Sequence, residues 1–446
     1  MMFAKAVSRA LILALVALPA WAAPQIQTWK TGNGAKVLFV PAPELPMLDA
    51  QVVFDAGSAR DGDTPGLASL TNALLNQGAG PWSADEVAER LEGVGAQLGT
   101  SSLRDMAWVS LRTLTREPAM EVALDTFAAV VARPAFRDED IERLRRSTLV
   151  ALSRDEQEPG SVGKKALYRQ IYGTHPYAGD PLGTEDSVGA LTGADIRGYH
   201  QRYYVAANAV VALVGDLSRD QAERVAERLV AGLPTGEAAV PVPPVPQLAQ
   251  GVTERRDFPS TQTHIYIGQP GMRRLDPDYF PLYVGNHILG GSGMVSLLTE
   301  EVREKRGLSY SVYSYFLPMS DLGPFMMGLQ TKNSQAAEAQ AVLLQTLARF
   351  TEQGPTAAEL KAAKQNITGG FPLRIASNGK IVQYLASIGF YGLPLDYLDR
   401  FNERVEAVTA EQIREAFQRR VHPAQFAVVI VGPQNGNSAA MAQVVD

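Results

Sequence analysis

The sequence predicts an α+β protein of two tandem homologous domains, each an antiparallel sheet with helices packed on one face. The 446-residue chain is 46% hydrophobic, enough for two cores. The segment Val188–Gly215 aligns without gaps with Val405–Gly432, at a constant offset of 217 residues, which indicates an internal repeat. Predicted strands come in groups between helix pairs and do not alternate with them one by one, which favours α+β over a doubly wound parallel sheet.

The first half is expected to open with strands and then a helix over 65–77. Thr64 and Pro65 suit the start of that helix, and Ser83 with Glu86 forms a capping box for the next one. The elements expected in order are strands in AKVLFVPA and LDAQVVFDAG, helices at 65–77 and 84–93, strands in TSSLRDMAWVSLRTL, and helices at 117–131 and 138–155.

The second half is expected to repeat this order. In the two repeat copies Thr192 and Thr409 are expected to cap a short helix, and the apolar runs AVVALVG and AVVIVG are typical of buried strands. The elements expected are strands at 264–268 and 309–316 and helices at 278–289, 294–305, 335–352 and 356–370.

The first 22 residues are typical of a signal peptide. Lys5 and Arg9 give a basic start, an apolar run follows that is too short to span a membrane, and Ala20-Trp21-Ala22 fits a cleavage site. Cleavage after Ala22 changes the formal net charge from −6 to −8. We expect a periplasmic protein; the alternative is an uncleaved anchor. No later segment is long and apolar enough to span a bilayer.

The predicted domain boundaries follow the composition of the chain. A proline-rich stretch over 234–251 favours extended backbone and is interpreted as a linker. It separates an N-terminal domain at 24–233 from a C-terminal domain at 252–433, and a flexible tail is expected at 434–446.

Composition excludes several classes of function. The chain has no cysteine, so disulfides, thiolate zinc sites and a cysteine nucleophile are all absent. Its acidic balance gives no signal for nucleic acid. The five histidines are scattered, no G-x-S-x-G elbow occurs, and His175, beside Pro176, is interpreted as structural in preference to a metal ligand.

The helix at 66–75, GLASLTNALL, has an apolar face and a second face that carries Ser69, Asn72 and Ala73. These three positions have the i, i+3, i+4 spacing at which a metallopeptidase helix places His, Glu and His, yet none of them is a metal ligand.

Two segments of the second half are candidates for substrate binding. Gly290, Gly291, Ser292 and Gly293 form a glycine-rich stretch, interpreted either as a flexible helix connection or as a backbone surface that an extended peptide can approach. It lacks the lysine of a P-loop.

Arg303 and Tyr310 flank the predicted helix end at Gly307. Each has an ordinary structural explanation, Arg303 as a complement to a helix C-terminus and Tyr310 as a strand residue. Together they have the chemistry to donate hydrogen bonds to one carbonyl oxygen.

The chain resembles the insulinase/pitrilysin-type metallopeptidases, whose two-part relatives include mitochondrial processing peptidase. The resemblance runs from about Ile26 to Gly432. It rests on FDAGSARD, GLASLTNALL, HPYAGDPLGTEDSV, NHILGGSGMVSLLTEEVREKRGLSYSVYS, LKAAKQNITGGFPLR and YGLPLDYLDRF.

The resemblance implies that Ser69, Asn72 and Ala73 replace the His, Glu and His of an H-x-x-E-H motif, and that a third ligand is missing near Val150. It implies that Arg303 and Tyr310 are the family's Arg/Tyr pair, which holds the substrate backbone and assists the oxyanion. No cofactor is expected in this chain.

In some relatives the zinc ligands lie on one subunit and the Arg/Tyr pair lies on another. The resemblance therefore implies a non-metal subunit of an exported heterodimeric peptidase, inactive alone, with a zinc-bearing paralogous partner and a peptide substrate. The alternative is a catalytically inactive peptide-binding or scaffold protein, as in the core-type relatives of respiratory complexes.

Overall fold

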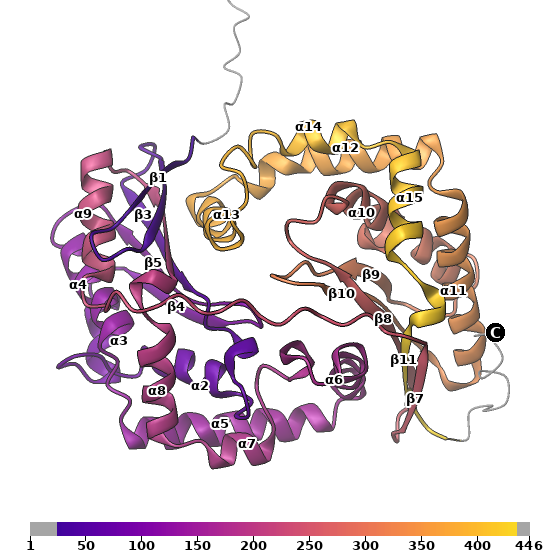
Figure 1. Ribbon diagram of the computed structural model, residues 1–446, viewed down its shortest axis with the longest axis horizontal. Coiled ribbons are helices and arrows are strands. Elements are labelled where there is room, and N and C mark those ends of the chain that lie inside the picture. Colours follow the sequence, from indigo (N-terminus) through magenta and orange to yellow (C-terminus); the bar gives the residue numbers. More distant parts are fainter. Residues whose placement is uncertain (1–24, 435–446) are drawn as a thin grey trace, which may run out of the picture.

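The computed structural model describes residues 25–434, which form two halves, each built around one sheet (Figure 1). The predicted signal peptide, 1–22, and the predicted tail from residue 435 onward lie outside the described residues. Within 25–434, no helix has the length and apolar character needed to cross a membrane.

The N-terminal sheet has six strands in the order β1-β2-β6-β3-β5-β4. All neighbouring strands are antiparallel except β2 and β6, which are parallel. Because β4 comes last in the strand order, it forms one edge of the sheet. The strands are β1 (Gln27–Lys30), β2 (Lys36–Pro41), β3 (Met47–Phe54), β4 (Gln97–Ser102), β5 (Ala107–Leu114) and β6 (Ala209–Gly215).

The C-terminal sheet repeats this plan with five strands in the order β7-β11-β8-β10-β9. Again one pair, β7 and β11, is parallel and the others are antiparallel, and β9 forms an edge. The strands are β7 (Val252–Asp257), β8 (Gln262–Met272), β9 (Val312–Phe316), β10 (Gly323–Lys332) and β11 (Ala427–Gly432).

Helices surround both sheets (Figure 1). Those of the first half are α2 (Leu67–Leu74), α3 (Ala84–Glu92), α4 (Ala119–Ala132), α5 (Asp138–Glu156), α6 (Pro159–Tyr172), α7 (Glu185–Ala190), α8 (Gly193–Tyr203) and α9 (Arg219–Val230). Those of the second half are α10 (Tyr279–Asn286), α11 (Ala336–Gln353), α12 (Ala357–Arg374), α13 (Asn378–Tyr391), α14 (Phe401–Ala407) and α15 (Ala410–Arg420).

The internal repeat predicted from the sequence matches the structure. Thr192 and Thr409 each cap a helix, α8 and α15, through a capping box, and both helices lead into a buried strand, β6 or β11. The capping box of Ser83 with Glu86 is also present. The predicted fold class, two tandem α+β domains, is confirmed.

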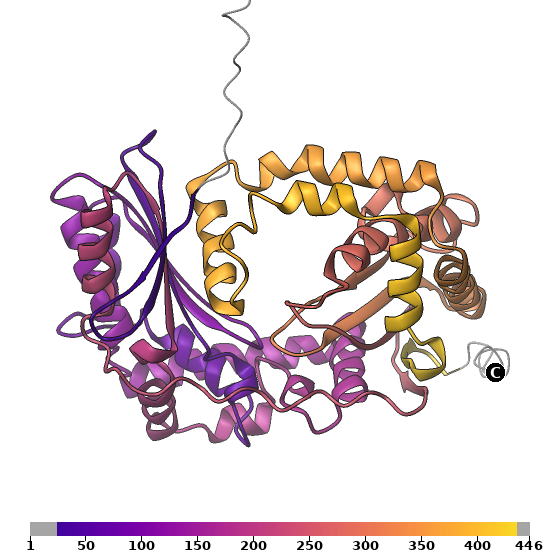
Figure 2. The ribbon, with the colours of Figure 1, turned by 45° about the horizontal axis from the view of Figure 1, so that its top comes forward.

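Each half lends one helix to the sheet of the other half. Helix α13 packs on the inner face of the N-terminal sheet, and α6 packs on the C-terminal sheet (Figures 1 and 2). Accordingly Leu38 and Val210 share one apolar core with Leu385 of α13. The two exchanged helices have the same length, 14 residues. Neither helix was predicted from the sequence. Because α13 and α6 pack on the inner faces of the sheets, helices cover both faces of each sheet.

The start of the predicted helix 65–77 differs from the expectation. Helix α2 begins at Leu67, after Gly66 with φ +92°, and Thr64 does not cap it. The Asp61 carboxylate instead accepts hydrogen bonds from the N–H groups of Gly66 (2.8 Å) and Ala68 (2.7 Å). Burial raises the pKa of Asp61 to about 7.

The segment predicted as a helix at 294–305 and a strand at 309–316 is also different. A 3₁₀ turn covers Gly293–Val295, a π-helix covers Thr299–Glu304, and β9 begins only at Val312. A second π-helix, His287–Gly291, follows α10. π-helices are rare in proteins, and those that occur are often found at functional sites.

The segment over 234–251 contains no helix or strand and runs between the two sheets (Figure 1). Hydrogen bonds hold it at several points, including Arg60 to the carbonyl of Val240 and the N–H of Val245 to Asp321. The domain boundaries drawn around this segment stay a prediction.

Candidate functional site

The three positions at which the resemblance implies a replaced zinc motif lie on α2, and two of them form hydrogen bonds within the protein. The hydroxyl of Ser69 donates to the carbonyl of Pro181 at 2.6 Å, and Ala73 is exposed. Asn72 is only 1% exposed. Its amide donates to the carbonyl of Trp108 (3.3 Å) and to the hydroxyl of Tyr204 (3.2 Å).

These residues do not fit a zinc site. Neither a hydroxyl nor an amide supplies the nitrogen or carboxylate ligands that zinc prefers, and Ala73 supplies no ligand. Val150, near the expected third ligand, is 70% exposed. Across residues 25–434, no group of three His, Cys, Asp or Glu side chains is placed to hold a metal ion.

His175 has the surroundings of a structural histidine. It is 7% exposed, its Nε2 lies 2.8 Å from the carbonyl of Pro243, and its Nδ1 accepts from the N–H of Tyr177.

The glycine-rich stretch forms a tight turn between the two π-helices. Gly290 is buried, and a Cβ there would lie 2.5 Å from the backbone nitrogen of Ser314, so this glycine permits close packing against β9. Gly291 and Gly293 are exposed, and Ser292 is half-buried. Of the four predicted substrate-binding residues, only Gly290 is thus closed to an approaching peptide.

Two hydroxyls fix the shape of this turn. The carbonyl of Gly293 accepts from Ser296 (2.9 Å) and from Thr299 (2.8 Å). At the tip Met294 and Val295 are 62% and 79% exposed. The turn therefore presents two apolar side chains to solvent from a rigid base.

Arg303 lies beside this turn. It projects from the π-helix, and its Nη1 lies 2.7 Å from the sulfur of Met294, while its Nε lies 3.5 Å from Glu304. Both contacts are weak: the sulfur of Met294 is a weak acceptor, and the ion pair with Glu304 is longer than a charge-assisted hydrogen bond.

Tyr310 lies on the bend that leads into β9 and is 85% exposed. No hydrogen bond between described residues joins it to Arg303, so the structure places Arg303 with the glycine-rich turn and leaves Tyr310 projecting into solvent.

Glu301 anchors the π-helix that carries Arg303. Its carboxylate accepts from Arg306 (2.7 Å), Lys305 (3.1 Å) and Arg349 (3.1 Å). The hydrogen bond from Arg306, with those from the other two cations, lowers the pKa of Glu301 to about 2. No sequence pattern indicated a role for this residue.

Sequence analysis also missed the free edge of β4. Among the strands of residues 25–434, β4 pairs with β5 alone, and pockets open on both of its faces. A pocket of about 460 Å³ lies between the inner face of the sheet and α13, and one of about 500 Å³ lies between β4 and α3. Gly99, a glycine within the strand, was the available signal, since such glycines mark places where backbone or ligand approaches closely.

Comparison with known proteins identifies the family. The profile described as insulinase (peptidase family M16) matches residues 36–185, and the profile described as peptidase M16 inactive domain matches residues 190–367. A solved structure from Pseudomonas fluorescens, described as a peptidase M16 inactive domain, has 40% identity and a TM-score of 0.89, covering 92% of this chain and 98% of that one. The chain belongs to the insulinase family of peptidases.

Curated relatives carry two kinds of name. A non-peptidase homolog, YmxG, from Helicobacter pylori is 27% identical over 393 residues, 86% of this chain and 89% of the relative. An uncharacterized zinc protease, YmxG, from Bacillus subtilis is 24% identical over 416 residues, 92% of this chain and 99% of the relative. In this chain the residues on α2 do not fit a zinc site, in agreement with the name non-peptidase homolog and with the inactive-domain profile.

Proposed function

We propose that this chain is the non-metal subunit of an exported heterodimeric zinc metallopeptidase. The observation that carries the proposal is a contrast within one chain. Ser69 and Asn72 are used in internal hydrogen bonds, whereas among residues 25–434 Arg303 contacts only the Met294 sulfur and, at 3.5 Å, Glu304, and Tyr310 is 85% exposed. A zinc-bearing paralogous subunit would complete the site, and the pattern of residues 1–22 supports export to the periplasm.

In this proposal the partner supplies the metal and its activated water, and this chain supplies hydrogen-bond donors. The guanidinium of Arg303 and the phenol of Tyr310 donate to the carbonyl oxygen of the scissile peptide. Donors aimed at an oxygen that gains negative charge stabilise the transition state, and loss of one costs about 100- to 1000-fold in turnover.

The test combines the purified chain with an exported relative that carries H-x-x-E-H, chosen from a neighbouring reading frame. Peptide cleavage is followed for the wild type, Tyr310→Phe and Arg303→Ala, with Arg202→Ala on α8 as an exposed arginine control. We expect cleavage to fall about 100-fold or more in the first two variants only, with unchanged assembly and thermal unfolding. Wild-type cleavage by both variants in an assembled complex would refute the proposal.

A second function, peptide binding without catalysis, is favoured by the free edge of β4. An exposed edge strand presents unpaired N–H and C=O groups to which an extended peptide adds as a further strand. The pockets on the two faces of β4 would receive alternate side chains of that peptide.

Alternate N-methylation tests this mode of binding. A strand presents every second N–H to each side, so methylating one alternate set of a fluorescent peptide should abolish binding and methylating the other set should not. Equal effects of the two sets, measured by fluorescence anisotropy, would exclude strand addition.

A further inference from the structure

Arg274, in the loop that follows β8, is a half-buried cation without a carboxylate partner. Among residues 25–434, no hydrogen bond or ion pair engages its guanidinium, and its Nε is enclosed without a partner. The two Nη atoms are not enclosed, so this end of the guanidinium remains open to solvent. A cation withdrawn from water costs free energy unless an anion compensates it.

Tyrosine side chains surround this guanidinium. Its Cζ lies 5.6 Å from the ring centroids of Tyr279 and Tyr391, and Tyr384 and Tyr397 also lie close to it. The rings hold the cation in place by cation–π attraction, and the phenols supply hydroxyl groups. None of these four neighbours is an acid, so the cluster holds a positive charge that its own members do not balance.

Arg374 adds a second cation to the same cluster. Its Nη1 donates to the hydroxyl of Tyr283 at 2.8 Å, and the ring of Tyr283 stacks on that of Tyr279 with centroids 6.0 Å apart. Within residues 25–434, Arg374 forms no ion pair with a carboxylate either. Two arginines therefore share this cluster of tyrosines without a negative charge between them.

The carboxylates in the vicinity of Arg274 are bound to other groups. They are Asp105 (bonded to Tyr177, Ser320 and Tyr391), Asp276 (paired with Arg420 at 2.7 Å) and Asp321 (paired with Arg273 at 3.5 Å). The protein thus leaves the open end of Arg274 to a group from outside.

The position of the cluster suits a peptide bound at β4. The first turns of α13 line the pocket beside β4, and Tyr384 and Tyr391 lie further along the same helix. Seven residues of helix rise about 10 Å, which three or four residues of an extended peptide span. A peptide at the edge of β4 could therefore extend to Arg274.

Resting on the proposed binding of peptides by this chain, we propose that Arg274 receives a carboxylate of the bound peptide, either an acidic side chain or the carboxyl terminus. The two open Nη atoms donate the paired hydrogen bonds that a carboxylate accepts, and Arg374 adds to the attraction. The formal net charge of the chain is −6, so its overall field repels such a ligand. A preference for carboxylate must therefore come from local contacts.

The test uses three fluorescein-labelled heptapeptides of alternating threonine and valine: one amidated at its C-terminus, one with a free C-terminus, and one amidated with a central glutamate. Binding to the full chain is measured by anisotropy. We expect at least one of the two carboxylate peptides to bind about tenfold more tightly than the neutral one, and the tighter one identifies the source of the carboxylate.

Arg274→Met should remove this preference, whereas Arg273→Met, one residue earlier and exposed, should leave it intact. Arg274→Lys keeps the charge without the paired donors and should retain part of it. A preference that persists in Arg274→Met, or equal affinity of the wild type for all three peptides, would overturn the assignment while peptide binding stands. Failure of all three peptides to bind would overturn both.

Thermal unfolding without peptide separates binding from packing. Arg274→Met removes an uncompensated charge, so we expect it to unfold at the wild-type temperature or above. A fall of more than about 4 °C relative to Arg273→Met would show that the tyrosine cluster requires the arginine for packing, and it would overturn the binding role.

Discussion

At the residue scale, Ser69 and Asn72 form internal hydrogen bonds at positions where the resemblance implies zinc-site residues. The buried Asn72 donates to the hydroxyl of Tyr204, whose ring packs at a tilt against Phe54 with ring centroids 4.6 Å apart. We predict that the purified chain retains no stoichiometric zinc after dialysis. Metal analysis checks this, and one tightly held zinc per chain would contradict it.

The burial of Asn72 also predicts a large cost for a charge at this position. Asn72→Asp removes the donor to the carbonyl of Trp108 and buries a carboxylate, so we expect unfolding free energy to fall by about 2–4 kcal/mol at pH 7. Ala73→Asp, one residue along and exposed, should cost about 1 kcal/mol or less. Urea denaturation of both variants measures the difference; equal losses would show that Asn72 is not a structural group.

The ion pairs of Glu301 predict how the stability of the fold depends on pH. Its pKa is about 2 in the folded chain against 4.5 ordinarily, so its ion pairs stabilise the fold above pH 4.5 and are lost as the pH falls toward 2. Because its cationic partners are partly exposed, Glu301→Gln should cost about 1–2 kcal/mol at pH 7 and progressively less in acid. Glu304→Gln is the exposed control. A loss that does not change between pH 7 and pH 3 would refute the assignment.

The placement of three residues on one face of α2 could be predicted from the sequence, and their surroundings could not. Spacing along α2 identified Ser69, Asn72 and Ala73 because a helix repeats locally. Their partners, Pro181 and Tyr204, lie more than 100 residues away, at distances that no local pattern encodes.

At the element scale, the exchanged helices depend on glycines at their contacts. A Cβ at Gly389 of α13 would lie 2.4 Å from Val210 and 2.8 Å from Leu38 on the N-terminal sheet. In α6, a Cβ at Gly163 would lie 2.4 Å from the ring of Tyr266. Both helices therefore approach their sheet more closely than any other residue type allows.

A glycine-to-alanine substitution tests the contact of α13 with the N-terminal sheet, and the same substitution in α12 serves as its control. Gly389→Ala should destabilise the fold by about 1–3 kcal/mol, because the methyl group overpacks the interface. Gly370→Ala in α12, where the added Cβ has no neighbour within 4 Å beyond the adjacent residues and the backbone of its own helix, should stabilise by about 0.5–1 kcal/mol through helix propensity. Thermal unfolding measures both, and a neutral Gly389→Ala would mean that α13 is loosely held.

Local signals predicted local elements well and missed what long-range packing decides. The capping boxes at Ser83, Thr192 and Thr409 are short-range patterns and appeared as expected. The π-helix at Thr299–Glu304 packs against α11 and β9 of its own half, and α6 and α13 pack on the sheet of the opposite half. Both arrangements depend on contacts between elements distant in the sequence, so periodicity alone gave no indication of them.

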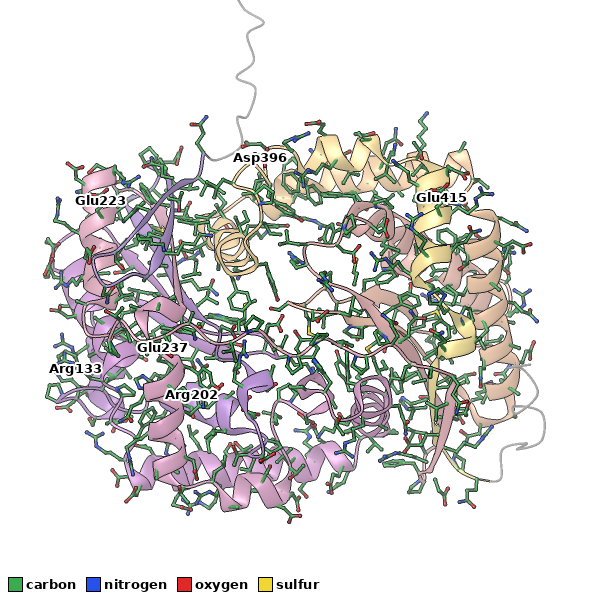
Figure 3. The ribbon with its side chains drawn as sticks, in the orientation of Figure 1. Arg133, Arg202, Glu223, Glu237, Asp396 and Glu415 are labelled. Carbon is green, nitrogen blue, oxygen red and sulfur yellow. The ribbon has the colours of Figure 1, made fainter. Side chains whose placement is uncertain are left out.

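At the scale of the whole molecule, the two halves interlock. Besides the exchanged helices, the buried carboxylate of Asp105 accepts from Tyr177 (2.6 Å) in its own half and from Ser320 (2.7 Å) and Tyr391 (3.1 Å) in the other half. Charged side chains such as Glu223 and Glu415 lie on the outer helices, away from this junction (Figure 3). The halves are thus joined by an apolar core with a polar link inside it.

This interlocking predicts that the linker is dispensable for cohesion once the chain has folded. Glu237 lies exposed in the segment over 234–251 (Figure 3), so a site-specific protease sequence inserted after it should be cut readily. A flexible link provides an effective concentration of only about millimolar, whereas an apolar interface of this kind binds far more tightly. We therefore expect two fragments on a denaturing gel and one unchanged peak on gel filtration at micromolar protein.

The cut Gly389→Ala chain should separate more readily, because its α13 contact is overpacked. Separation of the cut wild-type chain into two peaks would show that the covalent link, and not the helix exchange, holds the halves together.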